Sequence, residues 1–460
     1  MTTERSGAAA AARPPEASLR ENVIETSRLA GPVIVARSGG LILIAVDTAM
    51  TGRAGADELA YLAIGLAPQV VLFLVCIGLL AGTAVLSAQA DGAGARHDCG
   101  AIWRLAMIHA LVLGAIAGLF CLGGERFLLA TGQEPALARG GGEVMAMFSW
   151  GMPGIMIGIA TSFFLESIRR PKAGMVVMLG ANVVNAALNW IFIFGNLGAP
   201  AMGAEGAALA TSASRCGIAA ALIAYVFIMP GGAAYGIRGP IAGARELARK
   251  LRRIGYPLGL AYGLETAALM TLVLMAGYLG SAALAAFQIA HNLISLVFMT
   301  ALGFATATAV RVGHAVGRRH RPAMAIAGWT GITMAALTMA LFSGPFLALP
   351  EVLAALYTND PELALAAAAI IWVVGLLLVF DGVQGVTMGA LRGAGDVWIP
   401  ACLHLFSFWA VAIPTGALLA FHWGWGARGL MIGLLVGMAV ASIVLSLRFR
   451  VISTRDIRRL

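Results

Sequence analysis

The chain has 460 residues, of which 60% are hydrophobic and 12% are charged, with a net charge of +9 and a mean hydropathy of +0.88. Soluble domains carry about 25% charged residues, so the composition excludes an ordinary soluble protein and leaves room for roughly twelve membrane spans. The basic residues lie in short loops between apolar runs, which excludes nucleic acid as the reason for the positive charge.

Apolar runs bounded by charged residues, glycine or proline predict the membrane spans. To within a few residues these are 28–51, 61–88, 103–122, 143–165, 173–195, 205–229, 254–279, 283–310, 325–348, 363–390, 397–421 and 427–448. The predicted fold class is therefore an all-α integral membrane protein with about twelve transmembrane helices.

The spans divide into two sets of six. The expected units are a tail at 1–27, an N-terminal bundle at 28–230, a basic linker at 231–252, a C-terminal bundle at 253–448 and a tail at 449–460. The first ~18 residues are polar and rich in alanine, so they are expected to be disordered. The segment R-E-L-A-R-K-L-R-R (Arg245 to Arg253) predicts a basic helix lying on anionic lipid.

The positions of lysine and arginine predict the orientation. With both tails on one side, 25 of the 31 lysines and arginines fall on that side and only four in the opposite loops. Cytoplasmic loops of membrane proteins carry the excess of positive charge. Both termini are therefore expected on the cytoplasmic side of a bacterial inner membrane.

The two halves resemble each other at a nearly constant spacing. An offset of 225 residues pairs Gly52 with Gly277, Gly78 with Gly303 and Gly92 with Gly317. An even number of spans in each half makes the repeats parallel, related by an axis along the membrane normal. We therefore expect two pseudo-symmetric six-helix bundles around a central cavity.

Three acidic residues, Asp47, Glu265 and Asp381, lie far inside predicted spans. A carboxylate at membrane depth costs at least ~2.5–3.5 kcal/mol, so it faces a polar interior and usually has a function. The repeat does not duplicate these acids, since Asp47 corresponds to Leu272 and Glu265 to Gly40. Carboxylates that bind a cation or a proton point to ion-coupled transport, and a structural acid bonded to Ser, Thr or Asn is the alternative.

Neutral polar residues accompany the acids in the apolar runs. The candidates for supporting a cation or a substrate are Asn185, Asn189, Thr211, Gln288, Asn292 and Gln384. Their oxygens can complete a shell around a small hard cation. The alternative is interhelical hydrogen bonding, worth about 0.6 kcal/mol on average.

Other polar residues in the spans carry less information. Arg37 is expected to extend its long side chain to the interface, and the alternative is that it lines the cavity. His109 and His404 are expected to be hydrogen-bonded packing residues because no second His or Cys stands at ligand spacing. No nucleotide-binding motif occurs, so we expect neither an enzyme nor direct use of ATP.

Several segments resemble the multidrug and toxic compound extrusion (MATE) family. They are P-V-I-V-A-R-S-G-G-L-I-L-I-A-V-D-T-A-M-T-G (Pro32 to Gly52), Q-I-A-H-N-L-I-S-L-V-F-M (Gln288 to Met299), R-V-G-H-A-V-G (Arg311 to Gly317) and F-D-G-V-Q-G-V-T-M-G-A-L-R-G (Phe380 to Gly393). The resemblance covers about residues 28–450. A Glu eight residues after Pro257, together with Asp381, is similar to the NorM-like branch.

The resemblance implies two six-helix bundles around a V-shaped cavity and antiport of a cation against drugs. It implies that Glu265 and Asp381 form the cation site of the C-terminal bundle, with Na⁺ as one candidate ion, and that Asp47 binds a cation or proton in the N-terminal bundle. Asn185, Asn189 and Thr211 match the positions around that acid. Some relatives carry Asp where this chain has Asn189 and an aromatic residue where it has Leu377, which leaves Na⁺ and H⁺ both open.

The sequence thus predicts a monomeric secondary exporter that uses inward Na⁺ or H⁺ to expel small organic, mainly cationic, compounds, with membrane lipid as its surroundings and no cofactor. A lipid-linked oligosaccharide flippase of the same superfold would need a cationic cavity for pyrophosphate. An organic-anion exporter would be favoured if Arg37 faced the cavity. A membrane scaffold without transport would not need the three acids.

Overall fold

The computed structural model describes residues 18–241 and 243–456, so the expected disordered tail lies almost wholly outside the described residues. The first half contains α1 (Leu19–Ala54), α2 (Ala56–Leu80), α3 (Gly82–Gly92), α4 (Arg96–Leu122), α5 (Gly124–Ala130), α6 (Pro135–Ser149), α7 (Gly151–Ser167), α8 (Pro171–Phe194) and α9 (Gly203–Ile228). The second half contains α10 (Ala244–Tyr278), α11 (Ser281–Gly317), α12 (Arg321–Ala348), α13 (Pro350–Ala355), α14 (Pro361–Gly393), α15 (Trp398–Phe406), α16 (Ile413–Ala417) and α17 (Gly426–Thr454).

These helices confirm the predicted all-α membrane fold, and the described residues contain no strand. Within the described residues, eleven helical segments are long and apolar enough to cross a membrane, and α6 with α7, bent by 48°, makes a twelfth when the bent pair is counted as one span. Lipid offers no partners for backbone polar groups, so each span satisfies them within a helix.

Several spans are less regular than the sequence indicates. The span expected at 61–88 consists of α2 and α3, which meet at Ala81. The span expected at 397–421 is α15 and α16 interleaved with two π-helical segments, Ser407–Ala412 and Leu418–His422. Such π segments are frequent at functional sites.

The ends of two helices also differ from the predicted spans. The first helix begins at Leu19, where Ser18 and Glu21 form a capping box that fixes its start. The linker predicted at 231–252 contains a short 3₁₀ turn (Gly232–Tyr235), and its basic part forms the first turns of α10, continuous with the seventh span.

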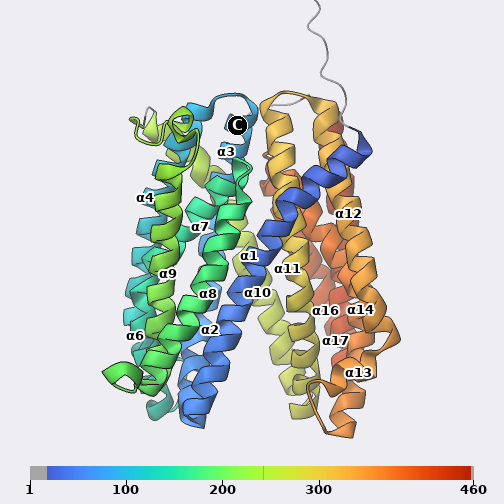
Figure 1. Cartoon of the computed structure of the whole chain (residues 1–460). Helices are drawn as coiled ribbons and strands as arrows, with labels where there is room; N and C mark the ends of the chain where they lie inside the picture. The colour runs from blue at the N-terminus through green and yellow to red at the C-terminus, as the bar shows by residue number, and fades with distance from the viewer. Residues whose placement is uncertain (1–17, 242, 457–460) are drawn as a thin grey trace, which may run out of the picture.

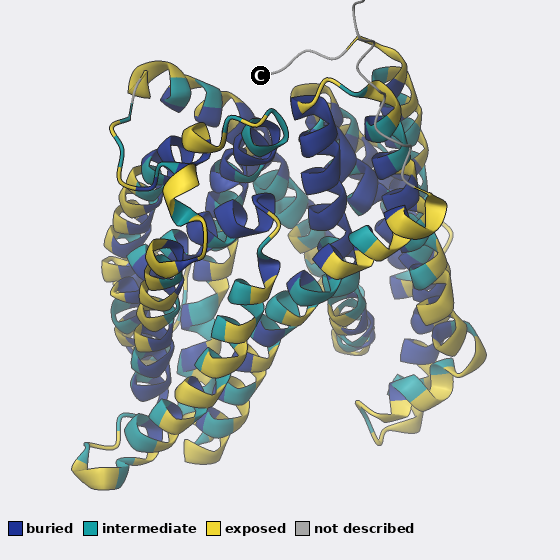
Figure 2. Ribbon diagram, turned by 45° about the horizontal axis from the view of Figure 1, so that its top comes forward, coloured by how far each residue is buried: buried dark blue, intermediate teal, exposed yellow. Residues whose placement is uncertain are grey.

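The two halves stand side by side and meet over part of their length. Figure 1 shows α2–α9 on one side, α11–α17 on the other, and α1 crossing obliquely between them. Across the boundary, α1 and α3 pack on α11, and α2 packs on α10. The buried turns gather toward the end of the molecule where the two halves come together (Figure 2), and Ala301–Gly317 of α11 are almost entirely buried there.

Glycines from the repeat provide the closest contacts between the halves. A Cβ on Gly78 of α2 would lie 2.5 Å from the backbone nitrogen of Gly259 on α10, and Gly303 faces Ile34 of α1. Gly92 lies against the backbone of His314, and Gly317 against that of Gln89. The glycine pairs at offset 225 therefore mark equivalent contacts in a pseudo-symmetric structure, because only a residue without Cβ lets the backbones approach this closely.

Candidate functional site

The first half of the chain holds a closed hydrogen-bond network around Asp47. The carboxylate of Asp47 on α1 accepts a bond from Asn189 Nδ2 on α8 (2.6 Å) and one from the Thr211 hydroxyl on α9 (2.5 Å). Asn185 joins the two donors, since its Oδ1 accepts from Asn189 (3.2 Å) and its Nδ2 donates to Thr211 (3.2 Å). Four polar residues from three helices thus meet at one place, as the resemblance implies.

This network is buried and leaves one acceptor unused. Asp47 is 3% exposed, and Asn185 and Asn189 are fully buried. The Oδ1 of Asn189 has no hydrogen-bond partner among the described residues. A buried carbonyl oxygen without a partner costs about 1–3 kcal/mol, so the cluster has room for one more donor or for a cation.

Arg215 lies one turn after Thr211 and brings a positive charge near the cluster. Its guanidinium donates to Gln69 Oε1 (2.9 Å) and stands over the ring of Phe148, with 5.0 Å between the guanidinium carbon and the ring centroid. These contacts orient Arg215 away from a direct bond to Asp47, which leaves the carboxylate held by neutral donors alone.

The second half of the chain holds a separate network. The Glu265 carboxylate on α10 lies 3.2 Å from His404 Nε2 on α15, and His404 Nδ1 lies 2.8 Å from Gln384 Nε2 on α14. Asp381 stands one turn before Gln384 and is 3% exposed, whereas the Glu265 side chain is 25% exposed. The structure thus brings Glu265 and Gln384 together through His404, which the sequence predicts to be a hydrogen-bonded packing residue and does not connect to either of them.

Asp381 differs from the other two acids because it lacks a full set of partners. Its Oδ2 is buried and accepts no hydrogen bond from a described residue. The charge of Glu265 is near enough to interact with that of Asp381. The described residues contain no cluster of three or more His, Cys, Asp or Glu with metal-site geometry, so these two acids do not form a ready-made metal cage.

Two of the predicted supporting residues lie elsewhere. Asn292 on α11 accepts a hydrogen bond from the hydroxyl of Tyr357 (2.8 Å) in an exposed position. Gln288, one turn earlier, is also exposed. The structure therefore does not join Asn292 to the acids, because α11 turns this face toward the loop after α13.

Arg37 does not extend to the interface as the sequence predicts. Its guanidinium lies 3.5 Å from Glu166 Oε1 on α7 and 5.6 Å from the centroid of the Phe163 ring. Glu166 is a fourth acid inside the protein. In the sequence it falls just after the span predicted at 143–165, next to the Arg169–Lys172 loop, so it was not recognised as a buried acid. A paired carboxylate explains why Arg37 remains inside.

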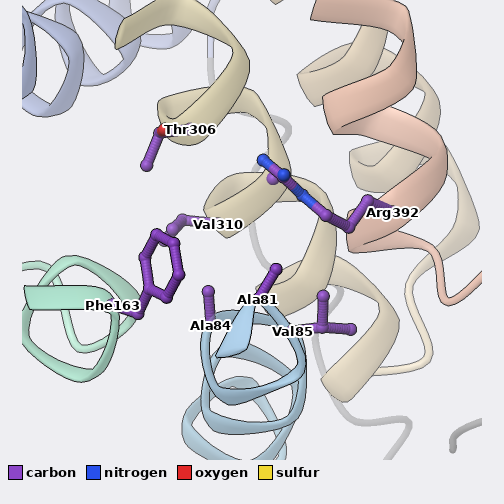
Figure 3. Close-up of a pocket in the computed structure, with 8 residues that line it drawn as sticks. Ala81, Ala84, Val85, Phe163, Thr306, Val310 and Arg392 are labelled. Carbon is purple, nitrogen blue, oxygen red and sulfur yellow. The ribbon is translucent and has the colours of Figure 1, made fainter. Parts of the chain in front are cut away.

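A small cavity lies beside this pair where the two halves meet. Figure 3 shows Phe163 of α7 and Arg392 of α14 projecting into it from opposite sides, with Ala84 of α3 and Thr306 of α11 completing the wall. Arg392 donates to the hydroxyl of Tyr262 on α10 (3.3 Å). Among the described residues that line this cavity, Arg392 is the one that carries a charge, and the others are mostly apolar.

A polar network closes the boundary at the end of α11. The guanidinium of Arg311, which is 6% exposed, donates to Thr26 (2.6 Å) and to Asn22 on α1 and pairs with Glu25 (3.4 Å). These contacts connect the second half of the chain to the first, and we call them, together with those of His314 below, the latch.

His314 forms the other part of the latch. Its Nδ1 accepts from Arg169 Nε (2.8 Å) and its Nε2 donates to the carbonyl of Ser167 (2.7 Å), which requires a neutral ring protonated on Nε2. Arg169 also pairs with Glu25 at 2.7 Å. His314 belongs to the segment R-V-G-H-A-V-G, which the resemblance singles out. Its partners Arg169 and Ser167 lie 145 and 147 residues away in the chain, so the sequence alone did not identify them.

Comparison with known families and structures agrees with this architecture. The family model described as MatE matches residues 32–191 and again 257–418. The two matches begin 225 residues apart, the offset of the glycine pairs.

Two curated relatives cover nearly the whole chain. A protein of Caulobacter vibrioides, named "Probable multidrug resistance protein NorM", is 35% identical over 99% of this chain and 97% of its own. The "Multidrug resistance protein NorM" of Burkholderia vietnamiensis is 33% identical over 95% and 96%.

A solved structure matches at the level of the fold. An outward-facing multidrug resistance MATE transporter of the MOP superfamily superposes with a TM-score of 0.86 at 20% identity, over 95% of this chain and 98% of that chain.

Proposed function

The chain belongs to the MATE family of membrane transporters, and from this premise we propose that it is a secondary exporter of small organic compounds coupled to inward movement of Na⁺ or H⁺. The observation that carries the proposal is the burial of Asp47 and Asp381, each 3% exposed. Beside Asp47, the Oδ1 of Asn189 has no hydrogen-bond partner among the described residues, and the same is true of Oδ2 of Asp381. A charge in such a place is costly unless a cation or proton joins it.

Each half then contributes one coupling site. In the first half, Asp47 binds the ion with Asn185, Asn189 and Thr211 as supporting ligands. In the second, Asp381 and Glu265 share a cation or a proton, because two neighbouring carboxylates raise each other's affinity for positive charge. Gln384 and His404 hold Glu265 in place, which makes both of them positioning residues rather than ion carriers.

Transport proceeds by alternating access between the two halves, which form units at about 28–230 and 253–448. The latch and the glycine contacts close one end, and their separation opens it. Helix α1 carries Asp47 and packs against α8 in its own half and α11 in the other. Loss of the ion at Asp47 therefore alters the packing of α1, the helix that contacts both halves.

The distribution of basic residues supports a cytoplasmic position for both termini and hence for the latch, in the inner membrane of a bacterium. The closed end then faces the cytoplasm, and the acids are reached from outside, where the coupling ion is abundant. The single chain contains both coupling sites, so the monomer is the transporting unit.

The charges favour cationic substrates. Glu166 compensates Arg37, which removes the feature that would support an organic-anion exporter. Gln69 and Phe148 hold Arg215, and it offers no partner to the pyrophosphate of a lipid-linked oligosaccharide. An acidic interior of low dielectric attracts organic cations more strongly than anions.

The test compares acid variants in proteoliposomes loaded with a fluorescent organic cation. Asp47→Asn, Glu265→Gln and Asp381→Asn should each lower export driven by a Na⁺ or pH gradient by at least about tenfold, while the protein stays folded. Glu362→Gln, on the exposed first turn of α14, makes the same chemical change away from the site and should export normally. Wild-type rates in all three acid variants under both gradients would refute the coupling sites.

A further inference from the structure

A basic groove lies outside the coupling sites, near the latch. It is lined by residues of α1, of the loop before α8, of the first turn of α8 and of the end of α9, among them Arg28, Arg169, Arg170, Lys172, Leu29 and Tyr225. Four of these side chains are cationic, and Glu25 is the one acidic residue in the lining. The groove therefore carries an excess of positive charge.

Two of these four cationic side chains have no hydrogen-bond or ion-pair partner among the described residues. Arg169 pairs with Glu25 at 2.7 Å, and Arg170 donates to the carbonyl of Pro230 at 2.5 Å. Arg28 and Lys172 are exposed and make no hydrogen bond or ion pair with another described residue. Two such cations in the same groove, one from α1 and one from α8, suit an anion bound there.

The first turn of α8 adds backbone donors to the same groove. Helix α8 has 24 residues, begins with Pro171, and has no side chain capping its first turn. Lys172 and Ala173, the second and third residues of this helix, line the groove, and the first amides of a helix have no partner within it. The partial positive charge of a helix N-terminus favours a phosphate at this point.

Exposed apolar side chains follow Lys172 along one face of α8. Leu29, Ala173 and Tyr225 form the less polar part of the groove. Beyond them, Val176, Leu179 and Val183 follow one another on one exposed face of α8. A molecule with a phosphate at one end and hydrocarbon chains at the other fits both parts, whereas a free phosphate ion would use only the first.

We propose that this groove binds the phosphate headgroup of an anionic phospholipid, with Arg28, Lys172 and the first turn of α8 around the phosphate and the acyl chains along α8. Basic pockets between transmembrane helices commonly receive such headgroups. The headgroup would lie in the leaflet at the end of the protein that carries the latch. The groove is distinct from the basic first turns of α10.

The experiment measures binding of phosphatidylglycerol to the full-length protein in detergent by native mass spectrometry. Phosphatidylcholine and inorganic phosphate serve as separate ligands. The double variant Arg28→Gln/Lys172→Gln removes the two free cations and leaves Arg169, which also holds Glu25 and His314, unchanged. The control Arg249→Gln/Lys250→Gln removes two cations from the basic segment of α10.

The groove variant should bind phosphatidylglycerol about twenty-five-fold more weakly, a factor of about five for each of the two cations removed near a membrane surface. The α10 control should bind it as the wild type does, and phosphatidylcholine should bind weakly to all three. Unchanged binding in the groove variant, or an equal loss in the control, would overturn the site. Inorganic phosphate binding as tightly as phosphatidylglycerol would overturn the assignment to lipid. Arg28, Lys172 and Arg249 are exposed and Lys250 is half-buried, and thermal unfolding checks that both variants fold.

Discussion

The contact of Gly78 with Gly259 makes a sharp test of closure between the halves. In Gly78→Ala, the new Cβ would lie 2.5 Å from the nitrogen and 2.6 Å from the Cα of Gly259, where ordinary contacts begin near 3.4 Å. Both atoms belong to the backbone of α10, so no side chain can rotate away. Helices α2 and α10 must separate by roughly 1 Å, and overpacking of this kind costs ~1–3 kcal/mol.

That cost falls on the closed arrangement alone, because the clash disappears when α2 and α10 move apart. A change of ~1–3 kcal/mol shifts the ratio of closed to open molecules by about 5–150-fold toward the open form. Export should fall, since the transporter would spend too little time closed at this end.

Cys76 provides the assay, because it is 3% exposed and belongs to the same apolar cluster as Leu251 and Leu258 of α10. In a background with the other four cysteines replaced, a small water-soluble thiol reagent should label Cys76 at least about fivefold faster in Gly78→Ala than in the parent. Gly180→Ala, where a Cβ would meet nothing within 4 Å, should label at the parental rate. A folded Gly78→Ala protein with parental labelling and export would refute the reasoning.

Three further predictions follow from the same structure. Glu166→Gln should lower the thermal stability in detergent by about 1–3 kcal/mol, because Arg37 loses its partner, and the double variant Arg37→Gln/Glu166→Gln should lose less than the two single variants together; additive losses would show that the pair does not interact. Cysteines placed at Arg249 and at Thr358 should label from opposite sides of the membrane, and labelling of both from outside would contradict the orientation. Cells that produce the protein should resist ethidium-like cations more than anionic drugs of similar size, and stronger protection against anions would favour an organic-anion exporter.

The sequence predicted the twelve spans because a long apolar run in lipid has little choice but to form a helix. Pro414, which lies in the first turn of α16 between the two π segments, is a local signal for that interruption because proline has no amide hydrogen to donate. The break at Ala81 has no proline beside it, so the sequence could not predict its place.

Asp47, Glu265 and Asp381 were evident from the sequence because a carboxylate is conspicuous in an apolar run. The residues that surround these acids were harder to predict. Asn185 and Asn189 share one helix face at a spacing of four, and the resemblance connected that face to Asp47. His404 was not assigned to Glu265, which lies 139 residues away, since a lone histidine carries no indication of its partner. A separation of 129 residues likewise kept Arg37 from being assigned to Glu166, and Arg311 lies even farther along the chain from Glu25.

Uphill export of an organic cation by the wild-type protein tests the central claim most directly. Purified protein in proteoliposomes, with ethidium equal on both sides, should move ethidium against its own gradient when Na⁺ or H⁺ is imposed in the opposite direction, and an ionophore that dissipates the gradient should stop it. The gradient that drives this movement identifies the coupling ion. Failure of both gradients to produce accumulation, with folded protein in the membrane, would contradict ion-coupled export.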